Sequence, residues 1–143
     1  MADIVHRFRI RAPAADVFRG ISTPQGLDAW WSKHAEGSPR EGGEYALGFG
    51  PAHQWRAVVV RCVPPTDFEL RMIRADDDWL GTRVGFRLDE TNGVTWVRFH
   101  HAGWPDANEH HEVSSFCWAM YLRLLRRHVE TGDVVPYETR LDA

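Results

Sequence analysis

Hydrophobic and polar residues alternate in six short stretches of the chain, which is the period-two pattern of half-buried β-strands. The stretches are residues 4–10, 44–49, 53–63, 68–74, 82–88 and 95–101. Clusters of Gly, Pro, Asp and Asn separate the later stretches, and the Asn92-Gly93 pair favours a tight hairpin turn. The last five stretches are therefore expected to form an antiparallel meander.

Three other segments show helical features. Pro13 suits the first turn of a short helix, and Thr23 is expected to cap a second short helix. A long helix is expected from Glu109 to Thr131, followed by Gly132 as a left-handed C-cap. Two short helices thus lie between the first and second strands, and one long helix follows the last strand.

The long helix is more apolar than an ordinary surface helix. Its apolar residues sweep roughly two-thirds of the circumference, whereas a one-sided amphipathic helix has a stripe of about 100°. These residues are Val113, Phe116, Cys117, Trp118, Met120, Tyr121, Leu122, Leu124, Leu125 and Val129. We expect such a helix to pack on more than one side.

This order of elements predicts an α+β fold of the helix-grip type. The expected architecture is a curved six-stranded antiparallel sheet, with two short helices between strands 1 and 2 and one long C-terminal helix. Because one helix cannot cover the whole concave face, a cleft between the helix and the sheet is expected. The 143 residues contain no linker-like segment, so we expect one domain over residues 1–143.

Charge and composition narrow the classes of function. The formal net charge is -3, and the positive residues are scattered, which disfavours nucleic-acid binding. The N-terminus lacks the apolar core of a signal peptide, and no apolar run is long enough to span a bilayer. Cys62 and Cys117 resemble small buried hydrophobes of a reducing compartment. We therefore expect a soluble cytoplasmic protein.

A series of local patterns covers nearly the whole chain. The patterns are Pro13-Ala14-Ala15-Asp16-Val17-Phe18, Thr23-Pro24 leading to Trp30-Trp31, Gly42-Gly43, Val63-Pro64-Pro65 followed by Phe68-Glu69-Leu70, residues 95–104, and the closing-helix residues Trp118, Leu122, Leu125 and Val129. In order and spacing they resemble the START-like, or birch-pollen-allergen-like, superfamily. Within it they resemble the family of activator of heat-shock protein 90 ATPase homologues.

The resemblance implies a helix-grip fold and several different functions. Members of the superfamily bind lipids, sterols, polyketides or plant hormones, cyclise or hydrolyse polyketides, or stimulate a chaperone ATPase. Eukaryotic chaperone activators of the family have an additional N-terminal domain, for which this chain is expected to have no room. The expected lack of this domain weakens the chaperone interpretation. The shared fold does not restore it, because a fold alone does not determine function.

We predict binding of a small hydrophobic molecule, such as a lipid, polyketide or aromatic metabolite, between the long helix and the sheet. Inward strand positions and apolar helix positions supply the candidate ligand-binding residues. They are Trp31, Phe68, Leu70, Met72, Phe86, Val97, Phe99, His101, Phe116, Met120, Tyr121 and Leu124. The chain has seven tryptophans, which are typical of a packed core but can also wall an apolar ligand site.

Two alternatives stay open. A polyketide cyclase or hydrolase could use His101 as acid or base, with Tyr121 or Arg98 as polar partner, although Arg98 alternates to the outer face. A hydrogen-bonded structural histidine also fits position 101. The other alternative is a protein-interaction module, either a chaperone ATPase regulator or a homodimer that buries exposed tryptophans.

No cofactor or metal is expected from the sequence. His110 and His111 are adjacent on a helix and point about 100° apart, so they do not converge on one ion. We interpret them as exposed residues at the start of the long helix. The acidic run 76–78 is interpreted as a solvated loop between strands.

Overall fold

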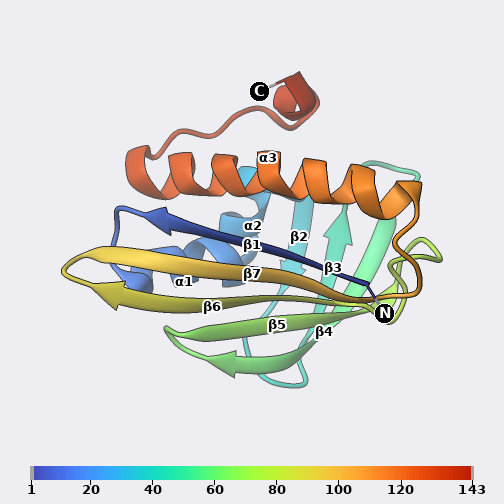
Figure 1. The fold of residues 1–143 in the computed structure, drawn as a ribbon, viewed down its shortest axis with the longest axis horizontal. Helices are drawn as coiled ribbons and strands as arrows, with labels where there is room; N and C mark the ends of the chain where they lie inside the picture. Colours follow the sequence, from blue (N-terminus) through green and yellow to red (C-terminus); the bar gives the residue numbers. More distant parts are fainter. Residues whose placement is uncertain (1, 143) are drawn as a thin grey trace.

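A seven-stranded antiparallel sheet forms the framework of the protein, with the strand order β1-β7-β6-β5-β4-β3-β2 (Figure 1). The strands are β1 (Ala2–Ile10), β2 (His34–Gly37), β3 (Glu44–Gly48), β4 (Gln54–Val63), β5 (Asp67–Arg74), β6 (Arg83–Thr91) and β7 (Val94–Trp104). The computed structural model describes residues 2–142. Met1 and Ala143, the ends of the predicted domain, lie outside the described residues.

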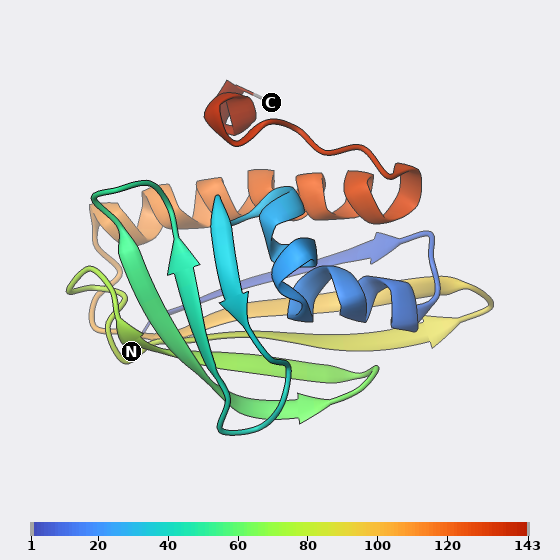
Figure 2. The same ribbon diagram turned by 180° about the vertical axis from the view of Figure 1, so that it is seen from behind.

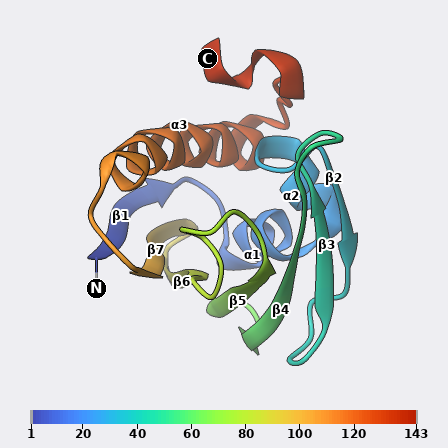
Figure 3. The same ribbon diagram turned by 90° about the vertical axis from the view of Figure 1, so that its right-hand side faces the viewer.

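Three α-helices pack within and across the curve of this sheet. They are α1 (Ala14–Ser22), α2 (Pro24–Trp30) and α3 (Glu109–Thr131), and the 3-10 helix η1 (Tyr137–Asp142) follows them. Viewed end-on, the sheet curls from β1 round to β2, with α1 inside the curve and α3 across its open side (Figure 3). Seen from behind, α1 and α2 lie between β1 and the β2–β4 half of the sheet (Figure 2).

The α+β helix-grip class predicted from the sequence is confirmed, but the number of strands is seven instead of six. The missed strand, β2, is a four-residue edge strand that pairs with β3. Only Ala35 of its four residues is buried, so it shows no alternating pattern that a sequence could reveal.

The caps of α3 agree with the sequence. The Asn108 side chain accepts a hydrogen bond from the backbone N–H of His111 at 3.0 Å, which begins the helix. Gly132 has a φ of 82° and ends it as a left-handed C-cap. Because both ends are fixed by local chemistry, the predicted bounds of this helix are confirmed.

The helix α3 packs on the sheet mainly through one stripe of side chains. Ser114, Trp118, Leu122 and Leu125 are buried and recur every three or four residues. On the other side of the helix, Phe116 has 80% of its surface exposed, but Leu124 is buried and the C-terminal segment with η1 lies over the helix (Figure 1). The helix is thus contacted from more than one side, while part of its wide apolar arc stays exposed.

The helices α1 and α2 fill one half of the concave sheet face. The ring of Phe18 contacts Phe68 with centroids 6.0 Å apart, and Trp30 contacts Phe86 at 6.1 Å. The indole N–H of Trp30 donates to the Gly20 carbonyl at 2.8 Å, so this large side chain is both buried and satisfied. Side chains therefore occupy this half of the space between the helices and the sheet.

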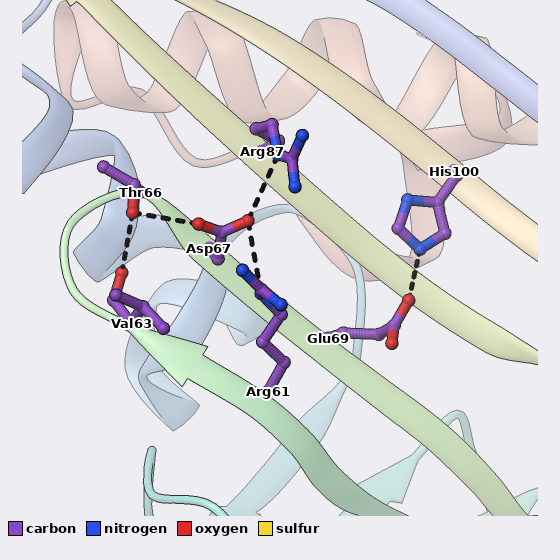
Figure 4. Close-up of polar contacts among 7 residues, drawn as sticks. All are labelled: Arg61, Val63, Thr66, Asp67, Glu69, Arg87 and His100. Atoms are coloured by element: carbon purple, nitrogen blue, oxygen red, sulfur yellow. Dashed lines mark hydrogen bonds and ion pairs between the residues drawn. The ribbon is translucent and has the colours of Figure 1, made fainter.

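The outer face of the sheet carries charge pairs (Figure 4). The Asp67 carboxylate lies between Arg61 and Arg87, with N···O distances of 3.5 and 3.3 Å. His100 on β7 reaches Glu69 on β5, with 2.5 Å between its Nε2 and the carboxylate. This face is polar and directed to solvent, so an apolar ligand site is expected on the concave side.

Three properties of the described residues bear on the function classes. Cys62 and Cys117 are free and half-buried. Within residues 2–142, no helix has both the length and the hydropathy that a membrane span requires. The same residues contain no cluster of three His, Cys, Asp or Glu side chains arranged to hold a metal ion.

The contact between α1 and α2 leads to the first prediction. A Cβ on Gly26 would lie 2.3 Å from the backbone oxygen of Arg19 and 2.8 Å from the Cα of Gly20. Helix propensity favours alanine by about 1 kcal/mol, but forcing backbones apart in a packed core costs typically 1–3 kcal/mol. We expect Gly26→Ala to lower the free energy of unfolding by about 1–2 kcal/mol, measured as a lower urea midpoint with an unchanged m-value.

The neighbouring substitution Gln25→Ala is the matched control, because Gln25 is exposed on the same helix. It is expected to change the free energy of unfolding by less than about 0.5 kcal/mol. A Gly26→Ala protein as stable as the parent would contradict the close approach of α1 and α2.

Candidate functional site

An aromatic cavity of about 220 Å³ lies beside the first half of α3, beyond the space that α1 and α2 fill. Side chains from the end of α2, the end of β3, β4, the β5–β6 loop and α3 line it. They are Trp31, Phe49, Trp55, Trp79, His110, Val113, Ser114, Cys117, Trp118 and Tyr121. We refer to these ten residues as the aromatic cavity.

Five aromatic side chains of the cavity form a closed ring of contacts. Trp31 contacts Phe49 at 5.2 Å between ring centroids, and Phe49 contacts Trp55 at 5.0 Å. Trp55 contacts Trp79 at 4.9 Å, and Trp79 stacks on Trp118 at 5.7 Å with 21° between the planes. Trp118 returns to Trp31 at 5.2 Å. Each ring is thus held by two neighbours, which gives the cavity a preorganised apolar wall.

A buried hydrogen-bond relay holds the ring of Trp118 and the backbone of Trp79. The indole N–H of Trp118 donates to Nδ1 of His101 at 3.0 Å. The other ring nitrogen of His101 lies 2.8 Å from the Thr82 hydroxyl, which donates to the backbone carbonyl of Trp79 at 2.5 Å. Because Nδ1 accepts and the Thr82 proton is already used, the neutral His101 must carry its proton on Nε2. The relay therefore links α3, β7 and the β5–β6 loop.

The environment of His101 keeps its imidazole neutral. The residue has no exposed surface, and burial, with smaller contributions from the neighbouring histidines, lowers its pKa from 6.5 to about 3. Both of its nitrogens are engaged, and it lies behind Trp79 and Trp118 instead of lining the cavity. The structure thus supports the structural interpretation of His101 and corrects its assignment as acid or base.

Several polar groups of the cavity have no partner. The indole N–H of Trp79 is buried without a hydrogen bond within residues 2–142. The Ser114 and Tyr121 hydroxyls also line the cavity, and neither bonds to another group of the described chain. Burial raises the pKa of Tyr121 and of Cys117, so both stay protonated at neutral pH. A few polar groups in an apolar wall are the usual composition of a ligand site.

His110 and Asp78 meet at the edge of the cavity. Nδ1 of His110 lies 3.0 Å from the Asp78 carboxylate, which also accepts a longer contact of 3.4 Å from the Asn108 amide. The hydrogen bond to His110 is the main reason that the pKa of Asp78 is lowered. The acidic loop is therefore tied to the start of α3, and our interpretation of residues 76–78 as merely solvated was incomplete.

Apart from His101, the sequence-predicted site residues fall into three groups. Trp31 and Tyr121 line the aromatic cavity. A second group consists of buried sheet residues that pack in the core and do not line it. These are Phe68, Leu70, Met72, Phe86, Val97 and Phe99.

The third group lies on the outer side of α3. Phe116 is placed roughly 160° around the helix from Trp118, so it points away from the sheet. With Met120 and Leu124 it borders a groove on the far side of α3, although Leu124 itself is buried in the core. None of these three predicted ligand-binding residues lines the aromatic cavity.

Most of the cavity wall is absent from the ligand-binding residues named from the sequence. The seven tryptophans are expected there as core residues or as walls of a ligand site, but Trp55, Trp79 and Trp118 are not singled out, and His110 is interpreted as an exposed residue of the helix start. One signal is present in the sequence: Trp79 directly follows three aspartates. A tryptophan beside an acidic run indicates that this part of the loop turns inward, and Trp79 is indeed buried, whereas the next residue, Leu80, is exposed.

Comparisons with known proteins agree with this architecture. The model of the family described as "Activator of Hsp90 ATPase homolog 1-like protein" matches residues 11–130. The solution structure of the Aha1 dimer from Colwellia psychrerythraea is 25% identical, with a TM-score of 0.83, covering 93% of this chain and 99% of that chain. CalU16 from Micromonospora echinospora is 25% identical, with a TM-score of 0.75, covering 99% and 72%.

A third similar structure is that of the Bacillus halodurans protein BH1534. It is 26% identical, with a TM-score of 0.75, and the match covers 91% of this chain and 98% of that chain. A comparison with curated proteins finds no match. The similar structures therefore define the architecture, while the side chains of the cavity define what it can bind.

The relay leads to a prediction about pH. The pKa of His101 is about 3 in the folded chain and near 6.5 when unfolded, so acid protonates the unfolded chain first. The stability that the neutral ring contributes is complete above about pH 6.5 and is lost as the pH falls towards 3. Between pH 7 and pH 5 we expect the parent to lose about 2 kcal/mol more unfolding free energy than His101→Gln does.

Urea unfolding followed by tryptophan fluorescence at each pH measures this difference. His34→Gln is the control, because the His34 side chain is 74% exposed and should keep the pH dependence of the parent. Parallel pH dependences of the parent and His101→Gln would show that His101 is not held in its neutral form.

Proposed function

The chain belongs to the Activator of Hsp90 ATPase homolog 1-like family, as its sequence patterns indicated, and we propose that it binds a small aromatic molecule in the aromatic cavity. The observation that carries the proposal is the closed ring of five aromatic side chains, with unpartnered polar groups beside it. Such a wall contributes a large apolar contact area, and the polar groups fix the orientation of the ligand.

The size of the cavity narrows the ligand class. An apolar protein cavity of about 150 Å³ holds benzene, and pockets for drug-sized ligands have about 300–1,000 Å³. At about 220 Å³ the aromatic cavity lies between these sizes. Of the lipids, polyketides and aromatic metabolites considered from the sequence, a molecule of one or two rings therefore fits best, and a long lipid or a sterol does not.

The polar groups narrow the chemistry further. The Tyr121 and Ser114 hydroxyls line the cavity, and each can donate and accept a hydrogen bond. A phenol or an aryl carbonyl would satisfy them while its ring contacts the wall. A purely hydrocarbon ligand would leave these buried groups unpaired, at a cost of about 1–3 kcal/mol each.

The free thiol of Cys117 bears on the location of the protein. It lines the cavity, and burial raises its pKa, so it is present as an unreactive thiol. A free thiol in a ligand site suits a reducing compartment. We therefore propose that the protein acts in the cytoplasm.

A second candidate function is protein interaction through the outer side of α3. Phe116 is 80% exposed and borders a groove of about 370 Å³ with Met120 and Leu124, next to Arg123 and Arg127. The similar protein from Colwellia psychrerythraea is a dimer. Self-association through this groove is the form that we propose. Docking on a chaperone ATPase, which the family description suggests, would use the same groove and the exposed Phe116.

The proposed ligand class can be tested with 1-naphthol, a two-ring phenol. Four of the ring side chains are tryptophans, so we expect saturable quenching of tryptophan fluorescence with a Kd below about 1 mM. Cys117→Leu should weaken binding at least about tenfold, because it fills the cavity with extra carbon atoms. Fluorescence titration and calorimetry measure both values.

Met120→Ala is the matched control on the same helix, because Met120 borders the outer groove and not the cavity. It should leave the Kd for 1-naphthol within about twofold of the parent. The proposal fails if quenching does not saturate, or if Cys117→Leu binds 1-naphthol as tightly as the parent does.

Self-association gives a separate prediction. If the outer groove joins two copies, the exposed Phe116 side chain becomes buried in the dimer. Phe116→Asp would place a carboxylate there and should raise the dimer dissociation constant at least about tenfold. Sedimentation velocity over a range of concentrations measures this constant. A parent that sediments as a monomer at every concentration would contradict self-association without affecting the ligand proposal.

A further inference from the structure

The hydrogen bond between His110 and Asp78 has a direction that determines which nitrogen of the imidazole is basic. An ionised carboxylate can only accept hydrogen bonds, so Nδ1 of His110 carries the hydrogen that points to Asp78 at 3.0 Å. The lowered pKa of Asp78 keeps that carboxylate ionised. In the neutral ring, Nε2 therefore has a free lone pair, and it has no hydrogen-bond partner within residues 2–142.

The position of His110 joins this basic nitrogen to the aromatic cavity. His110 is one of the lining residues, and its side chain is 40% exposed, so both a ligand and a water molecule can reach it. The ring of Trp104 packs against its face edge-on at 5.3 Å and restricts its rotation. Ser114 follows four residues later and therefore lies on the same side of α3.

We propose that His110 is a general base, positioned by Asp78, for the hydrolysis of a small aryl ester bound in the aromatic cavity. This inference rests on the proposed function, because the aromatic wall must hold the aryl group. A histidine whose second nitrogen is oriented by a carboxylate is well suited to act as a general base.

The reaction needs no group beyond water and the ester. Nε2 of His110 takes a proton from a water molecule as the water oxygen forms a bond to the ester carbonyl carbon. The resulting tetrahedral intermediate then collapses, and the bond from that carbon to the aryl oxygen breaks. The imidazolium returns the proton to the departing aryl oxygen, so the products are a phenol and a carboxylic acid.

The nucleophile of this step follows from the neighbours of His110. Tyr121 lies eleven residues further along α3, about 16 Å along the helix axis, so it is assigned no part in the step. Ser114 is not assigned as a nucleophile, because its hydroxyl forms no hydrogen bond with His110 among the described residues. Water is therefore the nucleophile that the geometry supports.

The test substrate is 1-naphthyl acetate, whose product 1-naphthol is followed by absorbance. We expect turnover by the parent above the buffer rate, and at least about a 100-fold lower kcat for His110→Gln, a loss far larger than any change in its Kd for 1-naphthol. Asp78→Asn should lower kcat about tenfold with little change in KM, because Asp78 orients the base and does not touch the ester. A merely structural link would change binding and thermal stability instead.

Two controls make the result specific. His34 also faces a carboxylate, with 3.6 Å between its Nε2 and Glu36, but this pair is exposed and lies outside the cavity. His34→Gln should therefore keep full turnover. His110→Ala should regain turnover when free imidazole is added. Circular dichroism checks that this variant is folded. If it is unfolded, the loss of kcat in His110→Gln alone decides the role of His110.

The outcomes separate the two proposals. If the parent binds 1-naphthol but does not hydrolyse 1-naphthyl acetate, the dyad proposal is overturned and the ligand proposal stands. Equal turnover by the parent and His110→Gln would also overturn the dyad. If the parent does not bind 1-naphthol at all, the proposed function itself has failed, and the dyad proposal fails with it.

Discussion

The hydrogen bond from the Trp118 indole to His101 is the interaction on which the concave side of the protein depends. It joins the long helix to β7, and the second nitrogen of His101 extends the connection through Thr82 to the backbone of the β5–β6 loop. All three side chains are buried. Removal of any partner would leave a buried polar group unpaired, which costs about 1–3 kcal/mol. The relay thus sets the distance between helix, sheet and loop, and with it the width of the cavity.

The same constraint explains why a cavity persists in a tightly packed fold. The helices α1 and α2 fill one half of the curved sheet, whereas rings held by the relay and by each other border the other half. Indoles are rigid, and Trp79 and Trp118 are each fixed by ring contacts and by the relay, so they cannot easily collapse into the space between them. The loop that supplies Trp79 also supplies Asp78, which places a polar pair at the edge of an apolar wall.

Much of the fold could be predicted from the sequence, because it depends on local chemistry. Thr23 accepts a hydrogen bond from Gly26 N–H at 3.0 Å as a helix cap, and Asn92 and Gly93 both adopt positive φ values in their turn. The site was less accessible, because alternation along a strand tells only which face is inward. It cannot tell that α1 and α2 fill the space over Phe68 and Phe86, nor which side of α3 faces the sheet. Those facts depend on contacts between residues far apart in the chain.

The most direct test of the central claim follows the seven tryptophan indole N–H signals by ¹H–¹⁵N NMR during a titration with 1-naphthol. We expect the signals of Trp31, Trp55, Trp79 and Trp118 to shift and saturate together, because these rings line the cavity. The signal of Trp96 should not shift, because this ring lies away from the cavity and is covered by the guanidinium groups of Arg7 and Arg9. Shifts centred on Trp96, or none among the four cavity signals, would contradict the assignment of the aromatic cavity as the ligand site.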